Sequence, residues 1–213
     1  FVLGALLACY LLVLQGLARY EERRAERAIA EIRASGAPTE APQLGEPRIP
    51  DRDNAALIYQ QAFERLNLTK EDDEFLGEVA TGKANLADPA SRARAKSIVA
   101  ANRATLRLLK QASQMPRCQF PVDWEAGFEA TFPHWAQTRQ CLRLLMAHAL
   151  LLARQGDAQG ALDNCTIALN ATQAATGESE MLSQLTKYAM LALVCRGLEL
   201  TLSETQPPPQ ACL

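Results

Sequence analysis

Histidine and aromatic residues are scarce in this sequence, and catalytic signatures are missing from it. It has two histidines, His134 and His148, and Phe, Trp and Tyr make up 6% of its 213 residues. It contains no Gly-rich phosphate loop, no G-x-S-x-G and no H-E-x-x-H motif. A formal net charge of -2 gives no electrostatic basis for binding nucleic acid. We therefore expect a non-catalytic protein without metal or cofactor and without a nucleic-acid partner.

The cysteines also lack a zinc pattern, because no C-x-x-C pair and no histidine at ligand spacing occurs near them. If the domain lies outside the cytoplasm, one disulfide is expected, and Cys118 with Cys141 is the preferred pair because Cys118 falls in a loop. The alternative is that the cysteines are thiols that act as small core residues.

Charge is absent from the first 17 residues, FVLGALLACYLLVLQGL. About 20 apolar residues cross a bilayer as a helix, so this segment predicts an uncleaved single-span anchor. The side chains facing lipid would be Phe1, Leu6, Leu11, Leu14 and Leu17, with Tyr20 at the headgroup level. The alternatives are a signal-peptide core and a lipoprotein box ending at Cys9. The signal-peptide core is disfavoured because the segment continues directly into RYEERRAERAIAEIR without a cleavage site. The lipoprotein box is disfavoured because the eight residues after Cys9 are almost all apolar, whereas a mature lipoprotein usually continues with polar residues.

A charged helix is expected to continue from the anchor, so that residues 1–35 form one unit. Ala25, Ala28, Ile29 and Ile32 make a narrow apolar seam along it, which suits a partner helix, a domain surface or a solvated stalk. Gly36 is a typical helix stop. Residues 36–50 contain four prolines and are predicted to be an extended linker.

Residues 51–206 are predicted to form an all-α domain, a helical bundle, and 207–213 a Pro-rich tail. Asp53-Asn54, the Thr69 and Asp72 capping pair, and Asp88-Pro89 indicate helix starts. The helices expected from them cover about 55–67, 71–80 and 88–115. The last of these helices is rich in Arg and Lys. We interpret these residues as its solvated face, and the alternative is a surface that binds phosphate or acidic lipid.

The last third is expected to form the core of this domain, in three helices. The first, from Pro133, is apolar nearly all round between Cys141 and Ala153 and so must be buried on several sides. Gln155-Gly156-Asp157 should separate it from a second helix ending near Thr176. A third is expected over about 179–203, with one face formed by Met181, Leu185, Tyr188, Ala192, Cys195 and Leu198.

Residues 116–133 are the one long irregular segment, and they hold Trp124 and Phe128 among carboxylates. Clustered aromatic residues in a loop form a lid or a binding surface, and we favour the lid. As an interaction surface, the candidates are Trp124, Phe128, Ile29 and Ile32.

Gly156-Asp157, Ala161 and Ala168-Leu169 stand at the spacings of the tetratricopeptide helical hairpin, which this region resembles. Leu152 and Gln173 depart from that pattern, and no second copy occurs. The resemblance implies an antiparallel hairpin. The order of apolar span, Pro-rich linker, Asn54-Ala55-Ala56 element and Gly-Asp hairpin also resembles an uncharacterised family of bacterial membrane-anchored proteins, which brings no activity with it.

A Phe at position 1 before a long apolar helix resembles the type IV pilins, whose helices bundle into a filament core. Ala5 stands where that family has Glu, and the strand-rich pilin head is not expected here. A filament subunit is nevertheless an alternative function.

The favoured function is a scaffold or accessory subunit of a membrane assembly, with lipid bound by residues 1–17 and other subunits or further copies as partners. A third alternative is a small-molecule-binding domain whose site would use Trp124, Trp135 and His134. Arg19, Arg23, Arg24 and Arg27 favour a cytoplasmic domain by the positive-inside rule. Cysteine usage and the usual signal-anchor arrangement favour the periplasmic or extracellular side of the inner membrane, which is the location we expect.

Overall fold

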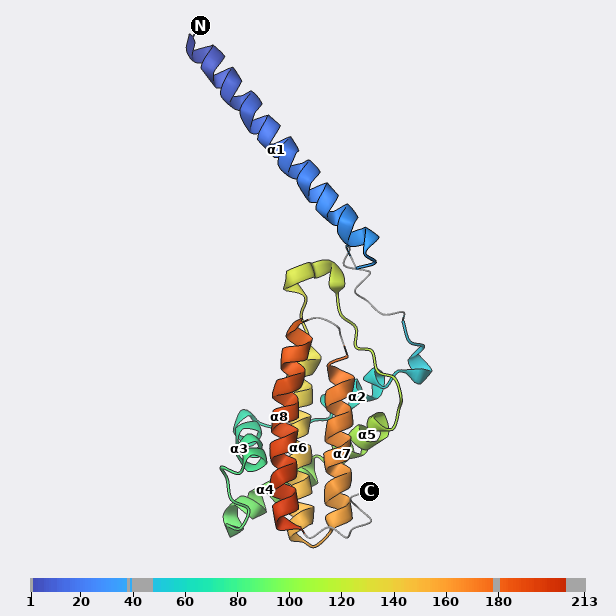
Figure 1. Cartoon of the computed structure of the whole chain (residues 1–213). Helices are drawn as coiled ribbons and strands as arrows, with labels where there is room; N and C mark the ends of the chain where they lie inside the picture. Colours follow the sequence, from blue (N-terminus) through green and yellow to red (C-terminus); the bar gives the residue numbers. More distant parts are fainter. Residues whose placement is uncertain (1, 38, 40–47, 178–180, 206–213) are drawn as a thin grey trace. The chain divides into compact units, whose positions relative to one another are not determined.

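The computed structural model describes residues 2–37, 39, 48–177 and 181–205, and it describes the exposure of these residues except 2–12 and Phe128. Every regular element in this part of the chain is a helix (Figure 1). The all-α prediction is confirmed for these residues, and no strand of a pilin-type head occurs among them. The predicted tail at 207–213 and most of the linker lie outside the described residues.

The chain divides into two compact units, of which the first comprises residues 1–46 and 123–130. It contains one long helix, α1 (Val2–Ala34), and the short helix η3 (Trp124–Glu129). Gly36 follows α1 with a φ of +80°, the conformation that closes helices, as predicted. No helix among the described residues combines the length and the hydropathy that crossing a bilayer takes.

The second unit, residues 47–122 and 131–213, is a bundle built around three long helices. Figure 1 shows α6, α7 and α8 lying side by side, and α6 also packs against α2, α3 and α4. The helices of this unit are α2 (Ala56–Glu64), α3 (Lys70–Thr81), α4 (Pro89–Ala101), α5 (Arg103–Ser113), α6 (Pro133–Arg154), α7 (Ala158–Ala175) and α8 (Met181–Glu204), after the short η2 (Asp51–Asp53).

Side-chain caps begin three of these helices where the sequence predicts them. Thr69 Oγ1 accepts the Asp72 N–H at 3.1 Å and completes a capping box at α3. Asp88 Oδ2 accepts the Ser91 N–H at 2.8 Å, and an oxygen of Asp157 accepts the Gly160 N–H at 2.9 Å. Each contact satisfies an N–H group that the first turn of a helix leaves without a backbone partner.

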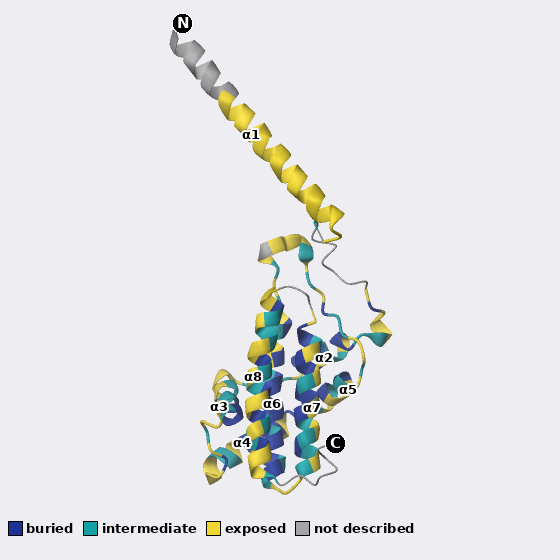
Figure 2. Cartoon of the chain, viewed as in Figure 1, coloured by how far each residue is buried: buried dark blue, intermediate teal, exposed yellow. Residues whose placement is uncertain are grey.

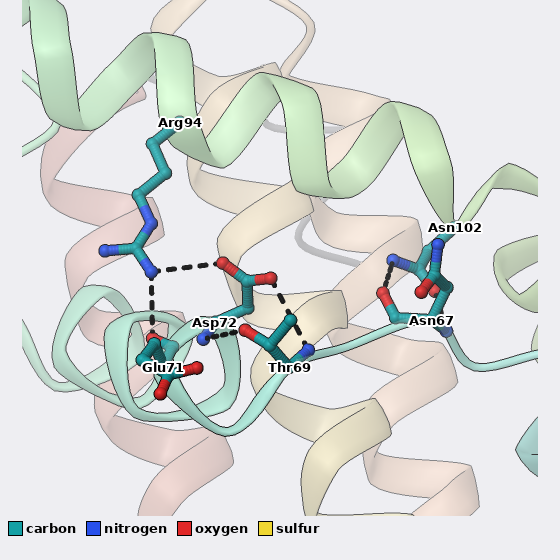
Figure 3. Close-up of polar contacts among 6 residues, drawn as sticks. All are labelled: Asn67, Thr69, Glu71, Asp72, Arg94 and Asn102. Atoms are coloured by element: carbon teal, nitrogen blue, oxygen red, sulfur yellow. Dashed lines mark hydrogen bonds and ion pairs between the residues drawn. The ribbon is translucent and has the colours of Figure 1, made fainter.

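The predicted helix over 88–115 is wrong in one respect, because the structure breaks it into α4 and α5 at Asn102. This side chain is fully buried, accepts the Asn67 N–H at 2.7 Å and donates to the Asn67 carbonyl at 2.9 Å (Figure 3). It also donates to the Ile98 carbonyl at 2.9 Å. The amide thereby ties the segment before α3 to the junction between α4 and α5.

A second contact holds α4 against the start of α3. Arg94 donates to Asp72 Oδ1 at 3.1 Å and to the Glu71 carbonyl at 3.0 Å (Figure 3), and its guanidinium lies 4.5 Å from the centre of the Phe75 ring. The bond from Arg94, followed by those from Thr69, holds the pKa of the Asp72 carboxyl below its usual range. Part of the basic charge of this region is therefore used within the fold.

The α6 helix is buried on two sides, as its apolar sequence predicts. Leu142, Leu145 and Met146 belong to a cluster with α2, α5 and α7. Leu144, Leu150 and Leu151 belong to a second cluster with α3 and α4. Fully burying a side chain of this size contributes about 1.5–3 kcal/mol, so α6 supplies much of the apolar stabilisation of the bundle.

Tight packing joins α6 and α7 across the turn at Gly156, whose φ of +85° is the left-handed conformation that glycine adopts without strain. Ala161 and Ala168 on α7 are fully buried, so the two helices approach through small side chains. His148 Nδ1 lies 3.0 Å from Asn164 Oδ1 between them. Burial lowers the pKa of His148, against smaller effects of Asn164 and Asp157 that raise it.

Candidate functional site

The outward face of α8 is the strongest candidate for a functional surface. Five of the six residues predicted to share one face are exposed, Met181 at 79%, Leu185 at 57% and Tyr188 at 68% among them. The sixth, Leu198, is half-buried and packs against the core. Figure 2 shows exposed residues recurring along α8. We call the following set the α8 stripe: Met181, Leu185, Tyr188, Ala192, Cys195 and Leu202, all exposed. Leu182 and Ala189 are exposed beside it.

The α8 stripe has the spacing of a helix-packing seam. Its members follow one another at alternating intervals of four and three residues, with Glu199 completing the series between Cys195 and Leu202. This is the a and d spacing with which one helix receives the side chains of another. Exposed apolar side chains gathered along one helix mark interaction sites, and here the Arg196–Glu199 ion pair is the charged interruption in the far half of the α8 stripe.

The inward side of α8 carries smaller residues than the outward side, which explains why this orientation is fixed. Its buried residues are Ser183, Met190, Val194, Gly197 and Thr201. A Cβ on Gly197 would lie 2.5 Å from Met146 Sδ and 2.7 Å from Met146 Cγ, so only glycine lets α8 come this close to α6. Met190 and Val194 enter the core beside this contact, and Leu193, Leu198 and Leu200 pack partly against it, whereas Met181, Leu185 and Tyr188 stay exposed.

Two polar contacts fix the far half of α8. Arg154 at the end of α6 donates to Glu204 Oε1 at 2.5 Å. Arg196 donates to the Thr81 carbonyl at the end of α3, at 3.4 Å, and Leu200 packs on Gly82. These contacts oppose rotation of α8 about its axis, so the α8 stripe is presented on a rigid element.

His134 and Trp135 are held in contacts with the bundle. His134 Nε2 lies 3.2 Å from the Ala175 carbonyl, and Trp135 Nε1 donates to the same carbonyl at 2.9 Å. His134 stacks on Phe120 with ring centres 4.2 Å apart, and Trp135 stacks on Phe132 at 4.1 Å. These contacts hold both side chains against the end of α7 and the segment that precedes α6.

The other predicted surface residues belong to the first unit. Ile29 and Ile32 are 45% and 46% exposed on α1, and Trp124 is half-buried in η3. The side chains of Phe128, Leu6 and Leu11, and residue Phe1, lie outside the described part of the chain. Leu14, Leu17 and Tyr20 of the predicted anchor are exposed. Grouping Trp124 with Trp135 in one site stays a prediction.

A cavity of about 420 Å³ opens elsewhere, between the end of α5, the loop after it and α7. Its lining is mostly polar and includes Tyr59, Ser113, Gln114, Arg117, Cys118, Asn170 and Gln173. The Tyr59 hydroxyl is buried and has no hydrogen-bond partner within the described residues. Burial, and then the neighbouring Cys118 and Cys141 sulfurs, raise the pKa of Tyr59.

Cys118 and Cys141 are both thiols in this structure, so the disulfide between them stays a prediction. Burial raises the pKa of Cys141 to about 12 and that of Cys165 to about 11, which keeps both in the unreactive thiol form at neutral pH. No group of three or more His, Cys, Asp or Glu side chains within the described ranges is placed to hold a metal ion.

Sequence reasoning missed the Tyr59 cavity and the Asn102 contacts, because both depend on residues far apart along the chain. The outward direction of α8 was missed because both of its faces are apolar, so periodicity alone leaves the orientation open. The one local signal was Gly197 among the inward residues. Comparisons with protein-family models, curated proteins and solved structures found no match to this chain.

Proposed function

We propose that this chain is a non-catalytic, membrane-anchored scaffold or accessory subunit that binds a helix of another membrane-protein subunit through the α8 stripe. The observation that carries the proposal is the seam of exposed apolar side chains along α8, on a helix whose opposite side packs closely on α6 at Gly197. A partner helix with a matching seam would cover these side chains and remove them from water, at about 25 cal/mol per Å² of apolar area.

The anchor in this proposal is the uncharged segment Phe1–Leu17. It lies in α1, whose 33 residues would extend about 50 Å at 1.5 Å per residue, enough for a bilayer core and a charged extension beyond it. The side chains of residues 2–12 lie outside the described ones, so the support here is the sequence. An inner-membrane location with the domain outside the cytoplasm belongs to the same proposal.

A helix fits the α8 stripe better than an extended peptide does. The alternating four and three spacing follows one side of a helix over its whole length, and Ala189 and Ala192 at its middle allow close approach of a second backbone. The α6–α7 hairpin, with its tetratricopeptide-like turn, supports α8 from behind. Both histidines have structural contacts of the kind described above, which agrees with a role in binding rather than in chemistry.

The test is purification of the full chain from its native membrane in mild detergent, alongside the double variant Leu185→Glu with Tyr188→Glu. We expect an integral membrane protein in fixed ratio with the chain, and its loss from the variant. The control Gln61→Glu, exposed on α2, should retain it. Retention of that protein by the double variant would refute the α8 stripe as the binding surface. If the chain is recovered only with copies of itself, the α8 stripe binds a second copy of this chain and not another subunit.

A second candidate function, binding of a small polar molecule, is favoured by the Tyr59 cavity. A buried hydroxyl without a partner beside the Arg117, Asn170 and Gln173 side chains is a group that a bound molecule could satisfy. Native mass spectrometry of the purified chain tests it. A bound small molecule that is lost in Tyr59→Phe would support this function, and identical spectra with no added mass would end it.

A further inference from the structure

Basic residues without acidic neighbours are concentrated between Pro89 and Val122, where no Asp or Glu occurs, although the whole chain has a formal net charge of -2. The basic residues of this segment are Arg92, Arg94, Lys96, Arg103, Arg107, Lys110 and Arg117. A charge separation of this size along an otherwise acidic chain creates a local positive field.

On α5 these charges form one face. Arg103, Arg107 and Lys110 follow at intervals of four and three residues and are all exposed, while Thr105, Leu109 and Ala112 on the opposite side are buried against the bundle. Arg117, also exposed, lies just beyond the end of the helix. We call Arg103, Arg107, Lys110 and Arg117 the α5 basic face.

The cations of this face are not used in the fold. Arg94 and Arg143 of the same unit bind Asp72 and Asp73, at 3.1 and 2.6 Å. Among the described residues, by contrast, no side-chain hydrogen bond or ion pair engages the four members of the α5 basic face. The helices packed against α5 are α2 and α7, whose carboxylates Glu64 and Asp163 form no ion pair with it.

We propose that the α5 basic face docks on the anionic phosphate headgroups of the membrane that holds the chain. This inference rests on the proposed anchor, because the tether supplies the proximity that makes a weak electrostatic contact effective. Residues 35–50 between α1 and η2 extend at most about 55 Å, and the part of α1 beyond Leu17 adds about 25 Å, so an anchored domain stays within about 80 Å of the surface. Within such a tether the effective concentration is on the order of millimolar, and polybasic surfaces bind anionic leaflets by charge alone.

An anionic bilayer suits this face better than one acidic peptide does. The four cations lie along a helix and a following loop, and the side chains exposed between them are those of Gln111, Gln114 and Pro116. None of these is a large apolar side chain that could anchor a peptide. A plane of phosphate groups needs none, because each cation finds a headgroup independently.

The test uses the full chain reconstituted in two kinds of vesicle, phosphatidylcholine alone and phosphatidylcholine with phosphatidylglycerol. The rate at which an amine reagent modifies Lys110 is measured by mass spectrometry, with Lys70 and Lys83, both exposed and outside the face, as internal references. We expect Lys110 to react about threefold or more slowly in anionic vesicles, because a surface potential of about -30 mV concentrates protons about threefold and headgroups block access. High salt should restore the rate.

Matched variants distinguish an effect of the α5 basic face from an effect of the overall positive charge. Arg103→Gln with Arg107→Gln should make Lys110 react equally fast in both vesicles, whereas Arg48→Gln with Arg139→Gln, two exposed cations elsewhere, should leave the difference unchanged. Equal Lys110 rates in the two vesicles for the natural chain would overturn the proposal. Equal rates in vesicles combined with protection in native membranes would assign the face to an acidic protein instead.

Vesicle flotation distinguishes this inference from the proposed anchor. A chain that floats with neutral vesicles in 1 M salt but shows no Lys110 protection has the anchor and lacks the docking contact. A chain that floats only with anionic vesicles and is released by salt has the docking contact and lacks the anchor, and a chain that floats with neither refutes both.

Discussion

Gly197 of α8 lies against Met146 of α6 so closely that a Cβ at position 197 would come 2.5 Å from the Met146 sulfur. Both residues are buried, and Val194 and Thr201 border the same contact on α8. The side of α8 that carries Gly197 therefore faces the bundle, and Met181, Leu185 and Tyr188 face solvent. This single contact links the packing of the core to the surface that we propose as functional.

Substitution of Gly197 tests this packing. We expect Gly197→Val to lower the free energy of unfolding by about 1–3 kcal/mol, because the added atoms must displace Met146 within a closely packed interior. Denaturant unfolding measures the effect. Ala189→Val, at an exposed position of the same helix, is the control and should change stability by at most about 0.5 kcal/mol. Equal stability of both variants would mean that α8 does not approach α6 as described.

The Asn102 amide tests the junction between α4 and α5. Asn102→Ala removes both hydrogen bonds to the Asn67 backbone, and we expect a loss of about 1–3 kcal/mol, since each such bond contributes about 0.5–1.5 kcal/mol. Ser97→Ala, at an exposed position of α4, should be nearly neutral. A nearly neutral Asn102→Ala would show that water replaces these bonds.

The Thr69 cap gives a smaller and more local prediction. Thr69→Ala removes the acceptor for the Asp72 N–H and should cost about 1 kcal/mol. Thr69→Ser keeps the hydroxyl and should retain most of the stability. Thermal unfolding of both variants against the natural chain measures the difference, and equal melting temperatures would count against the capping box.

His148 predicts a pH dependence of stability. Its pKa is lowered below the usual 6.5 by burial, so the unfolded chain takes up a proton at a higher pH than the folded chain does. The contribution of His148 to the free energy of unfolding is therefore fully present above pH about 6.5. It decreases as the pH falls below that value, by at most about 1.4 kcal/mol per pH unit. Urea unfolding at several pH values between about 7.5 and 5 measures the slope.

The matched variant for this prediction is His148→Gln, which keeps a polar side chain between α6 and α7 without a group that titrates in this range. We expect a flatter dependence on pH between about 6.5 and 5 than in the natural chain. Identical slopes would show that other groups cause the decline.

Local signals in the sequence predicted the helix starts and the buried character of α6. Thr69, Asp88 and Asp157 act within three residues of themselves, so their roles can be read without knowing the fold. The apolar run of α6 likewise excludes an exposed side. These features fix the elements, which is why the all-α class could be predicted.

The arrangement between elements could not be predicted in the same way. Asn102 ends a helix with no Gly or Pro beside it, and its partner Asn67 lies 35 positions earlier. The orientation of α8 depends on the fit of Gly197 to Met146, which is a property of two helices together. Both the missed break and the outward α8 stripe thus follow from contacts between distant residues.

The most direct test of the α8 stripe is site-specific photocrosslinking in native membranes. A photoreactive phenylalanine at Tyr188, a position 68% exposed, should form an adduct with a helix of an integral membrane protein. The adduct should disappear when Leu185→Glu is added, and the same probe at Gln61 should give none. Absence of that adduct at Tyr188, or its persistence with Leu185→Glu, would contradict the assignment of the α8 stripe as the partner-binding surface.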